Sequence, residues 1–186
     1  MATVKSIYWD SCVWIRLING EQDHELCQSV LDAAMRGEVQ IWTSSLTLAE
    51  VYKFKCDGPK ALAVESDQIF ESYISSDFVT EVQVDHEIAV LSRRLCRLHP
   101  PLKKPNDGIH LASAIVNNLD EFHTFDSDDL LVLNGSIHRA NGTLLNMCKP
   151  YSIREPQVIE AVEIPPLQLS FVDLPPAEPD GARPSQ

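Results

Sequence analysis

Apolar residues occur along this chain in two distinct patterns. Short apolar runs predict strands over residues 4–10, 39–43, 78–84, 121–126 and 144–153. Between them, apolar residues spaced three or four apart predict helices over residues 13–17, 25–36, 45–55, 60–75, 85–98, 105–118 and 127–133. Strands that alternate with helices are typical of an α/β/α sandwich, in which a central parallel sheet lies between two layers of helices.

Prolines divide the chain into two parts. Pro105 suits the first position of a helix. From Pro156 onward the character changes, because this stretch holds seven of the twelve prolines and shows no helical periodicity. We therefore predict one domain over residues 1–155 and a proline-rich, largely extended or disordered tail over residues 156–186. The proline pairs of the tail also fit a docking peptide.

The amino-acid composition is typical of a soluble globular protein. Of the 186 residues, 44% are hydrophobic and 23% are charged. No apolar run approaches the length of a membrane span, and the N-terminus lacks the apolar core of a signal peptide. The five cysteines are scattered and odd in number, which fits reduced thiols better than disulfides. These features predict a cytoplasmic protein that does not enter a membrane.

The formal net charge of the chain is −12. Taken over the whole molecule, this charge argues against a non-specific nucleic-acid binder, which usually has a basic surface. A function on nucleic acid would require the acidic side chains to gather in one place and a basic patch to lie elsewhere.

Four acidic residues stand where parallel strands end or where neighbouring helices begin. Asp10 ends the first predicted strand and Asp126 ends the fourth. Glu50 lies early in the helix after the second strand, and Asp107 lies in the first turn of the helix before the fourth. Ligands of open parallel sheets bind beyond the carboxyl ends of the strands. We therefore expect all four carboxylates to lie near one edge of the sheet.

Carboxylates gathered in this way repel one another. At an effective dielectric constant near 20, a pair about 4 Å apart costs roughly 4 kcal/mol, which protons or a cation must relieve. Oxygen ligands without a cysteine or histidine cluster favour Mg²⁺ or Mn²⁺ over zinc. Such ions polarise phosphoryl oxygens and lower the pKa of bound water, which is the chemistry of phosphodiester hydrolysis.

Each acid also has a purely structural interpretation. Glu50 could complete a capping box with Thr47 if a helix began there. Asp107 in a first helical turn favours the helix dipole, and Asp126 could cap the following helix. Asp10 is harder to explain in this way, because it lies between two apolar stretches where an unpaired charge is costly.

Four segments, in this order and spacing, resemble the motifs of PIN domains. Residues 7–15 are similar to the opening motif, a hydrophobic strand followed by Asp and Ser or Thr. Residues 45–51 resemble the second motif, residues 105–114 the third and most specific one, and residues 124–130 the fourth. The resemblance covers roughly residues 4–150 and implies a PIN-like α/β/α fold.

The resemblance also implies an activity, that of a Mg²⁺- or Mn²⁺-dependent endoribonuclease most like the VapC-type toxins of toxin–antitoxin modules. By motif position, the acidic catalytic site would consist of Asp10, Glu50, Asp107 and Asp126. The metal would be held by Asp10, Asp107 and Asp126. Side chains that support these ligands would be Ser11, Thr124, Asp128 and Asp129. Such toxins commonly form dimers and are silenced by an antitoxin protein that obstructs the site. Cys12 is a departure, since many members have Asn there.

A basic patch for RNA is available upstream of Asp107. It comprises Arg93, Arg94 and Arg97 on one helix face, followed by Lys103 and Lys104. These residues either hold RNA phosphates or form an ordinary solvated helix face and loop.

Other candidate residues are more easily explained by structure. His110 is expected to pack or to hydrogen-bond beside the site rather than to bind the metal. The aromatic residues in and beside predicted strands are expected in the core rather than stacked on bases; they are Tyr8, Trp9, Trp14 and Trp42.

Two other functions stay open. A phosphatase that forms an aspartyl phosphate on Asp10 would usually need a second acid two residues later, where this chain has Cys12. A non-catalytic PIN-like scaffold that binds a partner through its tail is the other alternative. The presence of all four acids argues against that scaffold.

Overall fold

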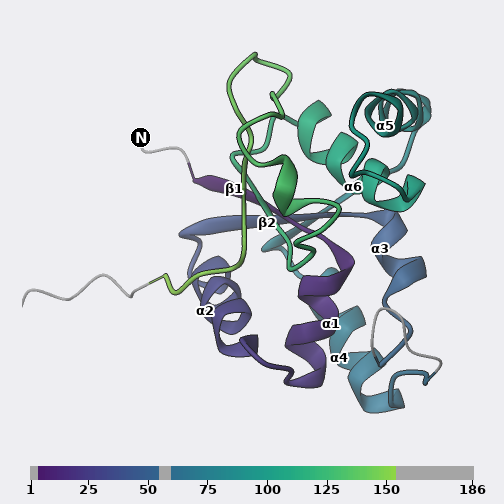
Figure 1. Cartoon of the computed structure of the whole chain (residues 1–186). Helices are drawn as coiled ribbons and strands as arrows, with labels where there is room; N and C mark the ends of the chain where they lie inside the picture. Colours follow the sequence, from purple (N-terminus) through teal and green to yellow (C-terminus); the bar gives the residue numbers. More distant parts are fainter. Residues whose placement is uncertain (1–3, 55–59, 154–186) are drawn as a thin grey trace, which may run out of the picture. The chain divides into compact units, whose positions relative to one another are not determined.

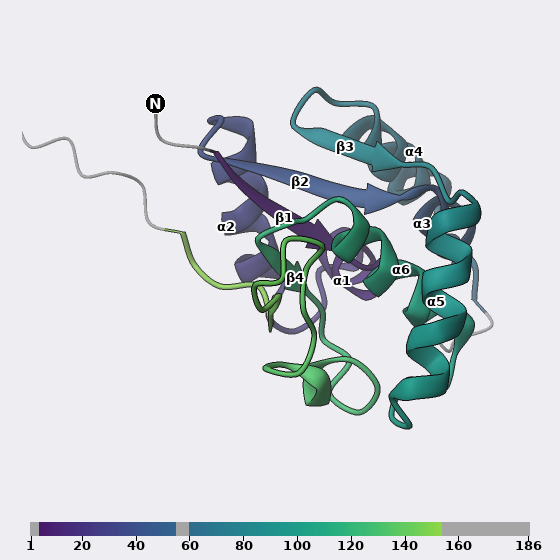
Figure 2. The same cartoon turned by 90° about the horizontal axis from the view of Figure 1, so that it is seen from above.

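The computed structural model describes residues 4–54 and 60–153. Its centre is a five-stranded parallel sheet with the strand order β3-β2-β1-β4-β5 (Figures 1 and 2). The strands are β1 (Lys5–Trp9), β2 (Val39–Ser44), β3 (Val79–Val82), β4 (Glu121–His123) and β5 (Asn146–Cys148). β1 lies in the middle, hydrogen-bonded to β2 on one side and to β4 on the other. The predicted α/β fold with a central parallel sheet is confirmed.

Helices cover both faces of this sheet, as Figure 1 shows. They are α1 (Ser11–Asn19), α2 (His24–Met35), α3 (Ser45–Glu50), α4 (Val64–Ile74), α5 (His86–Leu98), α6 (Pro105–Val116) and the short 3₁₀ helix η1 (Leu131–Leu133). Residues of α1, α2 and α4 pack with Ile7 and Trp9, whereas residues of α5 and α6 pack with Tyr8. Alternate residues of β1 thus point into opposite layers, as the two-residue period of a strand requires.

Aromatic side chains fill the core around β1. Trp9 and Trp14 are completely buried, with ring centroids 4.8 Å apart, and Phe70 of α4 lies 5.8 Å from the Trp14 ring. Burial of one large apolar side chain contributes about 1.5–3 kcal/mol. The prediction that Tyr8, Trp9 and Trp14 are core residues is confirmed, while Trp42 is only partly buried at the edge of the core.

Helix α3 is shorter than its sequence pattern predicts. It ends at Glu50, so the prediction of a helix continuing to residue 55 is wrong. The chain turns after α3, and its backbone hydrogen-bonds to the segment that precedes α4, for example from the Leu62 N–H to the Tyr52 carbonyl at 2.9 Å. α4 correspondingly begins at Val64, later than predicted. Pairing between segments overrides local helix propensity here.

The region around Asp126 also differs from the prediction. β4 ends at His123 instead of residue 126, and only three residues near the predicted helix 127–133 form a helix, η1. The Thr124 hydroxyl accepts the Asp126 N–H at 3.0 Å, and the Asp126 carboxylate accepts the Asp129 N–H at 2.9 Å. Side chains that bind nearby backbone groups in this way compete with strand and helix hydrogen bonds.

The predicted tail, residues 156–186, lies outside the described residues, and so does the docking peptide proposed within it. The division into a domain and a tail stays a prediction. Among the helices of residues 4–54 and 60–153, none is both long and apolar enough to cross a membrane.

Close packing between α5 and α6 fixes the helix that carries Asp107. A Cβ atom added at Gly108 would lie 2.6 Å from the Ser92 Oγ atom and 2.8 Å from the Cys96 Sγ atom. We expect Gly108→Ala to lower the free energy of unfolding by about 1–3 kcal/mol, because a packed interface must shift to admit the methyl group. Chemical denaturation measures this change.

A second variant identifies the cause of that loss. Adding Ser92→Ala to Gly108→Ala removes the closest clashing atom, so part of the lost stability should return. Wild-type stability in the single Gly108→Ala variant would contradict this account of the packing.

Candidate active site

The carboxyl ends of β1 and β4 form the natural ligand-binding edge of this sheet. The strand order reverses direction at β1, since β2 and β3 lie on one side of it and β4 and β5 on the other. Crevices at such a switch point are where open α/β sheets bind ligands. A cavity of about 440 Å³ lies there and is lined by Asp10, Glu50, Asp107 and Asp126, among others. We call this cavity the acidic pocket. The structure thus brings the four predicted acids together.

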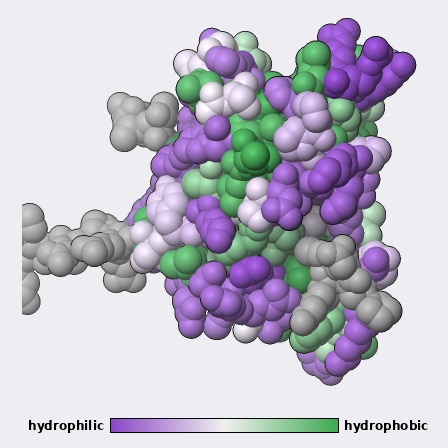
Figure 3. All heavy atoms as spheres, viewed as in Figure 1, coloured by the Kyte–Doolittle hydropathy of each residue, from purple (hydrophilic) through white to green (hydrophobic). Residues whose placement is uncertain are grey.

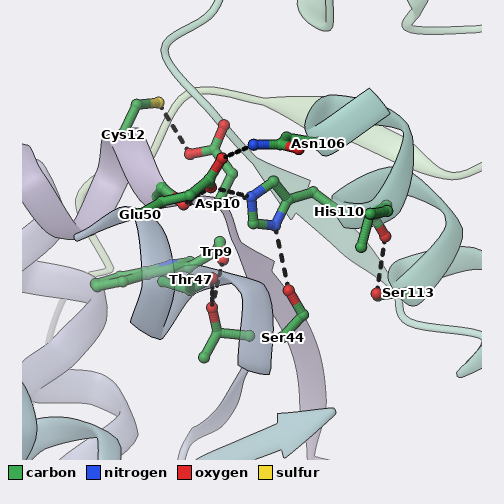
Figure 4. Close-up of polar contacts among 12 residues, drawn as sticks. Trp9, Asp10, Cys12, Ser44, Thr47, Glu50, Asn106, His110 and Ser113 are labelled. Carbon is green, nitrogen blue, oxygen red and sulfur yellow. Dashed lines mark hydrogen bonds and ion pairs between the residues drawn. The ribbon is translucent and has the colours of Figure 1, made fainter. Parts of the chain in front are cut away.

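Asp10 is almost completely buried and caps α1. Its Oδ1 atom accepts a hydrogen bond from the Val13 N–H at 3.2 Å and one from the Cys12 thiol at 2.9 Å (Figure 4). Burial raises the pKa of Asp10, and His110 and the Cys12 hydrogen bond partly oppose that effect. Asp10 is therefore both a helix cap and a wall of the acidic pocket.

Glu50 is held by three side chains at the end of α3. Its carboxylate accepts hydrogen bonds from the Ser11 hydroxyl, from Asn106 Nδ2 at 2.7 Å and from His110 Nε2 at 2.7 Å (Figure 4). Burial alone would raise the pKa of Glu50, but these contacts, that of His110 foremost, lower it to about 2. Glu50 is consequently ionised at any physiological pH.

The capping-box interpretation of Glu50 is wrong. α3 begins at Ser45 with Ser44 as its cap, so Glu50 is the last residue of the helix rather than a residue of its first turn. Thr47 is buried and shares a 2.7 Å hydrogen bond with Thr43. Thr47 therefore does not pair with Glu50 at the start of a helix.

His110 links Glu50 to the core. Its ring is buried, with Nδ1 2.8 Å from the Tyr8 hydroxyl while Nε2 binds Glu50. The expectation that His110 packs and hydrogen-bonds beside the site agrees with these contacts. The series of hydrogen bonds from Tyr8 through His110 fixes the position of the Glu50 carboxylate.

Asp107 carries the least compensated charge of the pocket. Its Oδ2 atom is buried and has no hydrogen-bond partner within the described part of the chain. Burial, together with the like charges of Asp126 and Asp10, raises the pKa of Asp107 to about 6, although Lys104 opposes the effect. Its place in the first turn of α6 also agrees with the helix-dipole interpretation.

A small group of oxygen atoms surrounds Asp107. One carboxylate oxygen from each of Asp107, Asp126 and Asp129 lies within 4.8 Å of the other two. Among the residues described, Asp10 is not a member of this group. It nevertheless lines the same pocket, and its like charge helps to raise the pKa of Asp107. Oxygen ligands at this separation suit a hard divalent ion, and Mg²⁺ usually uses only one or two carboxylates and keeps several waters. The donor set therefore fits Mg²⁺ or Mn²⁺.

The structure separates the two acids that follow Asp126. Asp129 is buried and pairs with Lys103 at 3.1 Å and Lys104 at 3.9 Å. Asp128 is exposed and accepts a hydrogen bond from Ser127. The Asp126 carboxylate accepts the N–H groups of both, which lie in a turn rather than in a helix, so the interpretation that Asp126 caps the following helix is wrong.

The match to a family decides what kind of domain holds this pocket. The family model described as PIN domain matches residues 7–132, which is more than half of the chain. The chain belongs to the PIN domain family. A search of curated protein sequences gave no match.

Solved structures similar to this PIN domain share its fold. VapC20 of Mycobacterium tuberculosis, described as a sarcin–ricin loop cleaving toxin, has a TM-score of 0.53 and 16% identity over 66% of this chain and 91% of its own. A toxin–antitoxin complex from Klebsiella pneumoniae has a TM-score of 0.53 and 22% identity, covering 79% and 99%. VapBC2 of Rickettsia felis, bound to a promoter DNA fragment, has a TM-score of 0.53 and 16% identity, covering 76% and 98%.

The predicted basic residues lie in two places in this PIN domain. Lys104 lines the acidic pocket, and Lys103 pairs with Asp129 beside it. Arg93, Arg94 and Arg97 are exposed on α5, where Figure 3 shows a strongly hydrophilic surface, and they do not line the pocket. Only the lysine end of the predicted patch therefore adjoins the acids.

A second cluster of potential metal ligands in this PIN domain differs from the acidic pocket in its charge balance. Glu121, His123 and Cys148 bring potential ligand atoms within 4.8 Å of one another. Lys5 lies 2.7 Å from the Glu121 carboxylate, and the Tyr151 hydroxyl donates to it at 2.9 Å. Burial would raise the pKa of Glu121, but these contacts and a hydrogen bond with His123 lower it to about 2. Because protein groups already balance this carboxylate, the acidic pocket has the stronger need for a cation.

Three contributors to the PIN-domain site were missed from sequence. They are the Asn106 amide and the Tyr8 hydroxyl, which help to hold Glu50 and His110, and the Cys12 thiol on Asp10. Asn106 is polar and precedes Asp107 in the first turn of a helix, so its position was a usable signal. The Tyr8 hydroxyl gave none, since core aromatic residues seldom reveal where their polar end points.

Proposed function

We propose that this protein is a Mg²⁺- or Mn²⁺-dependent endoribonuclease that acts as the toxin of a toxin–antitoxin pair. The observation that carries the proposal is the Oδ2 atom of Asp107, which is buried in a pocket of four carboxylates and has no hydrogen-bond partner among residues 4–54 and 60–153. A buried charge without a partner is costly, and a bound divalent ion removes that cost. Membership of the PIN domain family and the nuclease activity known for that family support the same conclusion.

Asp107 and Asp126 would hold the ion, with Asp10 completing the acidic wall beside it. When bound, the ion supplies a polarised phosphoryl oxygen and a water of lowered pKa. Glu50, whose pKa is about 2, is a poor acceptor for a proton, so its role is to orient the attacking water through its fixed carboxylate. Ser11 and His110 hold that carboxylate in place. Thr124 fixes the backbone of Asp126.

RNA would enter along the basic side of the pocket. Lys104 lines the pocket and can contact a phosphate next to the one that is cut. Arg93, Arg94 and Arg97 on α5 would bind more distant phosphates. A basic patch of this kind makes RNA binding weaken steeply as the salt concentration rises.

An antitoxin protein is the expected partner, and a homodimer is the expected assembly in a cytoplasmic setting. Support comes from the similar folds solved as toxin–antitoxin complexes. Co-expression tests this part of the proposal. The chain alone should stop growth of a bacterial host, Asp107→Asn should not, and the product of an adjacent gene should restore growth.

The experiment for the activity uses purified protein, RNA and either Mg²⁺ or Mn²⁺, with and without EDTA. Asp10→Asn and Asp126→Asn should each lower the cleavage rate at least about 100-fold, the scale seen when a group that stabilises transition-state charge is removed. Asp120→Asn is the matched control, because Asp120 binds Ser6 and Arg139 away from the pocket.

Three results separate the alternatives. Metal-dependent cleavage that is lost in the two pocket variants supports the ribonuclease. Intact RNA under every condition, from protein free of inhibitor, would favour the non-catalytic scaffold. A phosphate found covalently on Asp10 would favour the phosphatase.

A further inference from the structure

The acidic pocket has a second wall that carries no charge. Ile15 of α1, Leu46 and Ala49 of α3, and Tyr52 line the same cavity as the four acids. Ile15 is buried, whereas Tyr52 is 53% exposed. The cavity therefore offers oxygen ligands on one side and an apolar, aromatic surface on the other.

The early end of α3 creates this surface. Glu50 closes the helix and faces the acids, Val51 enters the core, and Tyr52 follows at the rim of the pocket. Had the helix continued, the side chain two positions after Glu50 would point about 200° around the helix axis from it. The turn instead brings Glu50 and Tyr52 to one cavity.

The backbone under Tyr52 is fixed from both sides. The Tyr52 N–H donates to the Glu50 carbonyl at 2.9 Å, and its carbonyl accepts the Leu62 N–H at 2.9 Å. The next residue, Lys53, forms an antiparallel bridge with Ala61. An exposed aromatic ring on a fixed backbone loses little conformational entropy when a flat ligand covers it.

Lys53 adds a positive charge to the same rim. Its Nζ atom lies 5.0 Å from the centroid of the Tyr52 ring, and Lys53 also lines the pocket. Aromatic rings flanked by cations are the usual means by which proteins hold unpaired nucleobases next to their phosphates. The cavity volume of about 440 Å³ falls within the range of sites that enclose small ligands.

We infer that this wall is a nucleobase subsite, in which the base next to the cut phosphate stacks on Tyr52 and contacts Leu46. The inference rests on the ribonuclease proposal, since the acids fix where the phosphate lies. A base held in a duplex is paired and stacked on its neighbours, so it cannot enter the cavity. The substrate is therefore RNA with an unpaired nucleotide at the cut site.

The test compares Tyr52→Ala, Tyr52→Phe and Tyr52→Trp with the wild type, using one single-stranded RNA and the same RNA annealed to its complement. Tyr52→Ala should lower kcat/KM about 5- to 100-fold, the equivalent of roughly 1–3 kcal/mol for one stacked base, mostly through KM. Tyr52→Phe and Tyr52→Trp should stay within about threefold of the wild type, because both retain an aromatic face. The duplex should be cut far more slowly than the single strand.

Phe54→Ala is the matched control. Phe54 is an exposed aromatic residue two positions further on that does not line the pocket. Its loss should leave cleavage unchanged, and melting curves of every variant should be recorded to exclude unfolding.

A second readout does not depend on cleavage. The fluorescent base 2-aminopurine is placed at each position in turn of a short single-stranded RNA, and binding is followed in the Asp10→Asn background with Tyr52 intact or replaced by alanine. Quenching that requires an aromatic residue at position 52 supports the subsite even if no RNA is cut. Cleavage that is insensitive to Tyr52→Ala would overturn the subsite and leave the ribonuclease intact. If the protein shows neither cleavage nor quenching, both the subsite and the ribonuclease proposal are overturned.

Discussion

Replacing Asp107 with asparagine should abolish metal-dependent RNA cleavage and, without metal, leave the protein at least as stable as the wild type at pH 8. The cleavage rate should fall at least about 100-fold, because the variant loses the carboxylate most in need of a cation. The unusual feature is the sign of the stability effect, since most substitutions at buried positions are destabilising.

The raised pKa of Asp107 explains that sign. Its pKa is about 6 in the folded protein against 3.8 ordinarily, so ionisation costs more in the folded state than in the unfolded chain. The penalty is absent below pH 3.8, grows as the pH rises toward 6, and is complete above it. After allowance for solvent screening of this partly exposed group, Asn should gain about 1 kcal/mol at pH 8 and nothing near pH 4.

Chemical denaturation in EDTA at the two pH values measures this gain. Asp120→Asn is the control of opposite sign, because hydrogen bonds from Ser6 and Arg139 lower the pKa of Asp120 despite partial burial. That variant should lose stability at pH 8 and keep its activity. Retained cleavage in Asp107→Asn, or a clear loss of stability at pH 8, would contradict the interpretation of Asp107 as an uncompensated ligand.

Replacing His110 with alanine should have the largest effect on stability, a loss of about 2–4 kcal/mol. The change removes a buried ring that donates to Glu50 at 2.7 Å and binds the Tyr8 hydroxyl at 2.8 Å. Removing one partner of a buried hydrogen bond typically costs about 1–3 kcal/mol, and the lost ring also leaves a cavity; Glu50 is a quarter exposed, which reduces the first contribution. Cleavage should also fall, since the Glu50 carboxylate is no longer fixed.

Two further variants at histidine positions isolate the role of the hydrogen bond. His110→Gln keeps an N–H donor near the position of Nε2 and should recover part of both the stability and the cleavage rate. His138→Ala removes an exposed histidine far along the chain and should change stability by no more than about 0.5 kcal/mol. Equal losses for His110→Ala and His110→Gln would show that the ring's volume matters and its bond to Glu50 does not.

Topology made the gathering of the acids predictable. The short apolar run within residues 4–10 and the acid that closes it locate Asp10 at the end of a strand. A parallel sheet then brings the ends of neighbouring strands and the starts of their helices to one edge. The same reasoning placed Glu50 and Asp107 there without knowledge of their contacts.

Contacts between distant segments were beyond the reach of sequence patterns. α3 ends at Glu50 because of bonds such as the one between Tyr52 and Leu62, which no helical periodicity records. Asp129 rather than Asp128 lies beside Asp107 because of how Asp126 turns the backbone. Local propensity predicts elements, but the pairing of separate segments decides where they end.

The most direct test of a shared cation is a crystal structure of the protein grown with Mn²⁺, with the ion located by its anomalous scattering. The account predicts an ion in the acidic pocket that is bound by Asp107 and Asp126, with Asp10 either bound to it or linked through one of its waters. An ion found only outside this pocket, or a pocket without an ion at millimolar Mn²⁺ and pH 8, would contradict it.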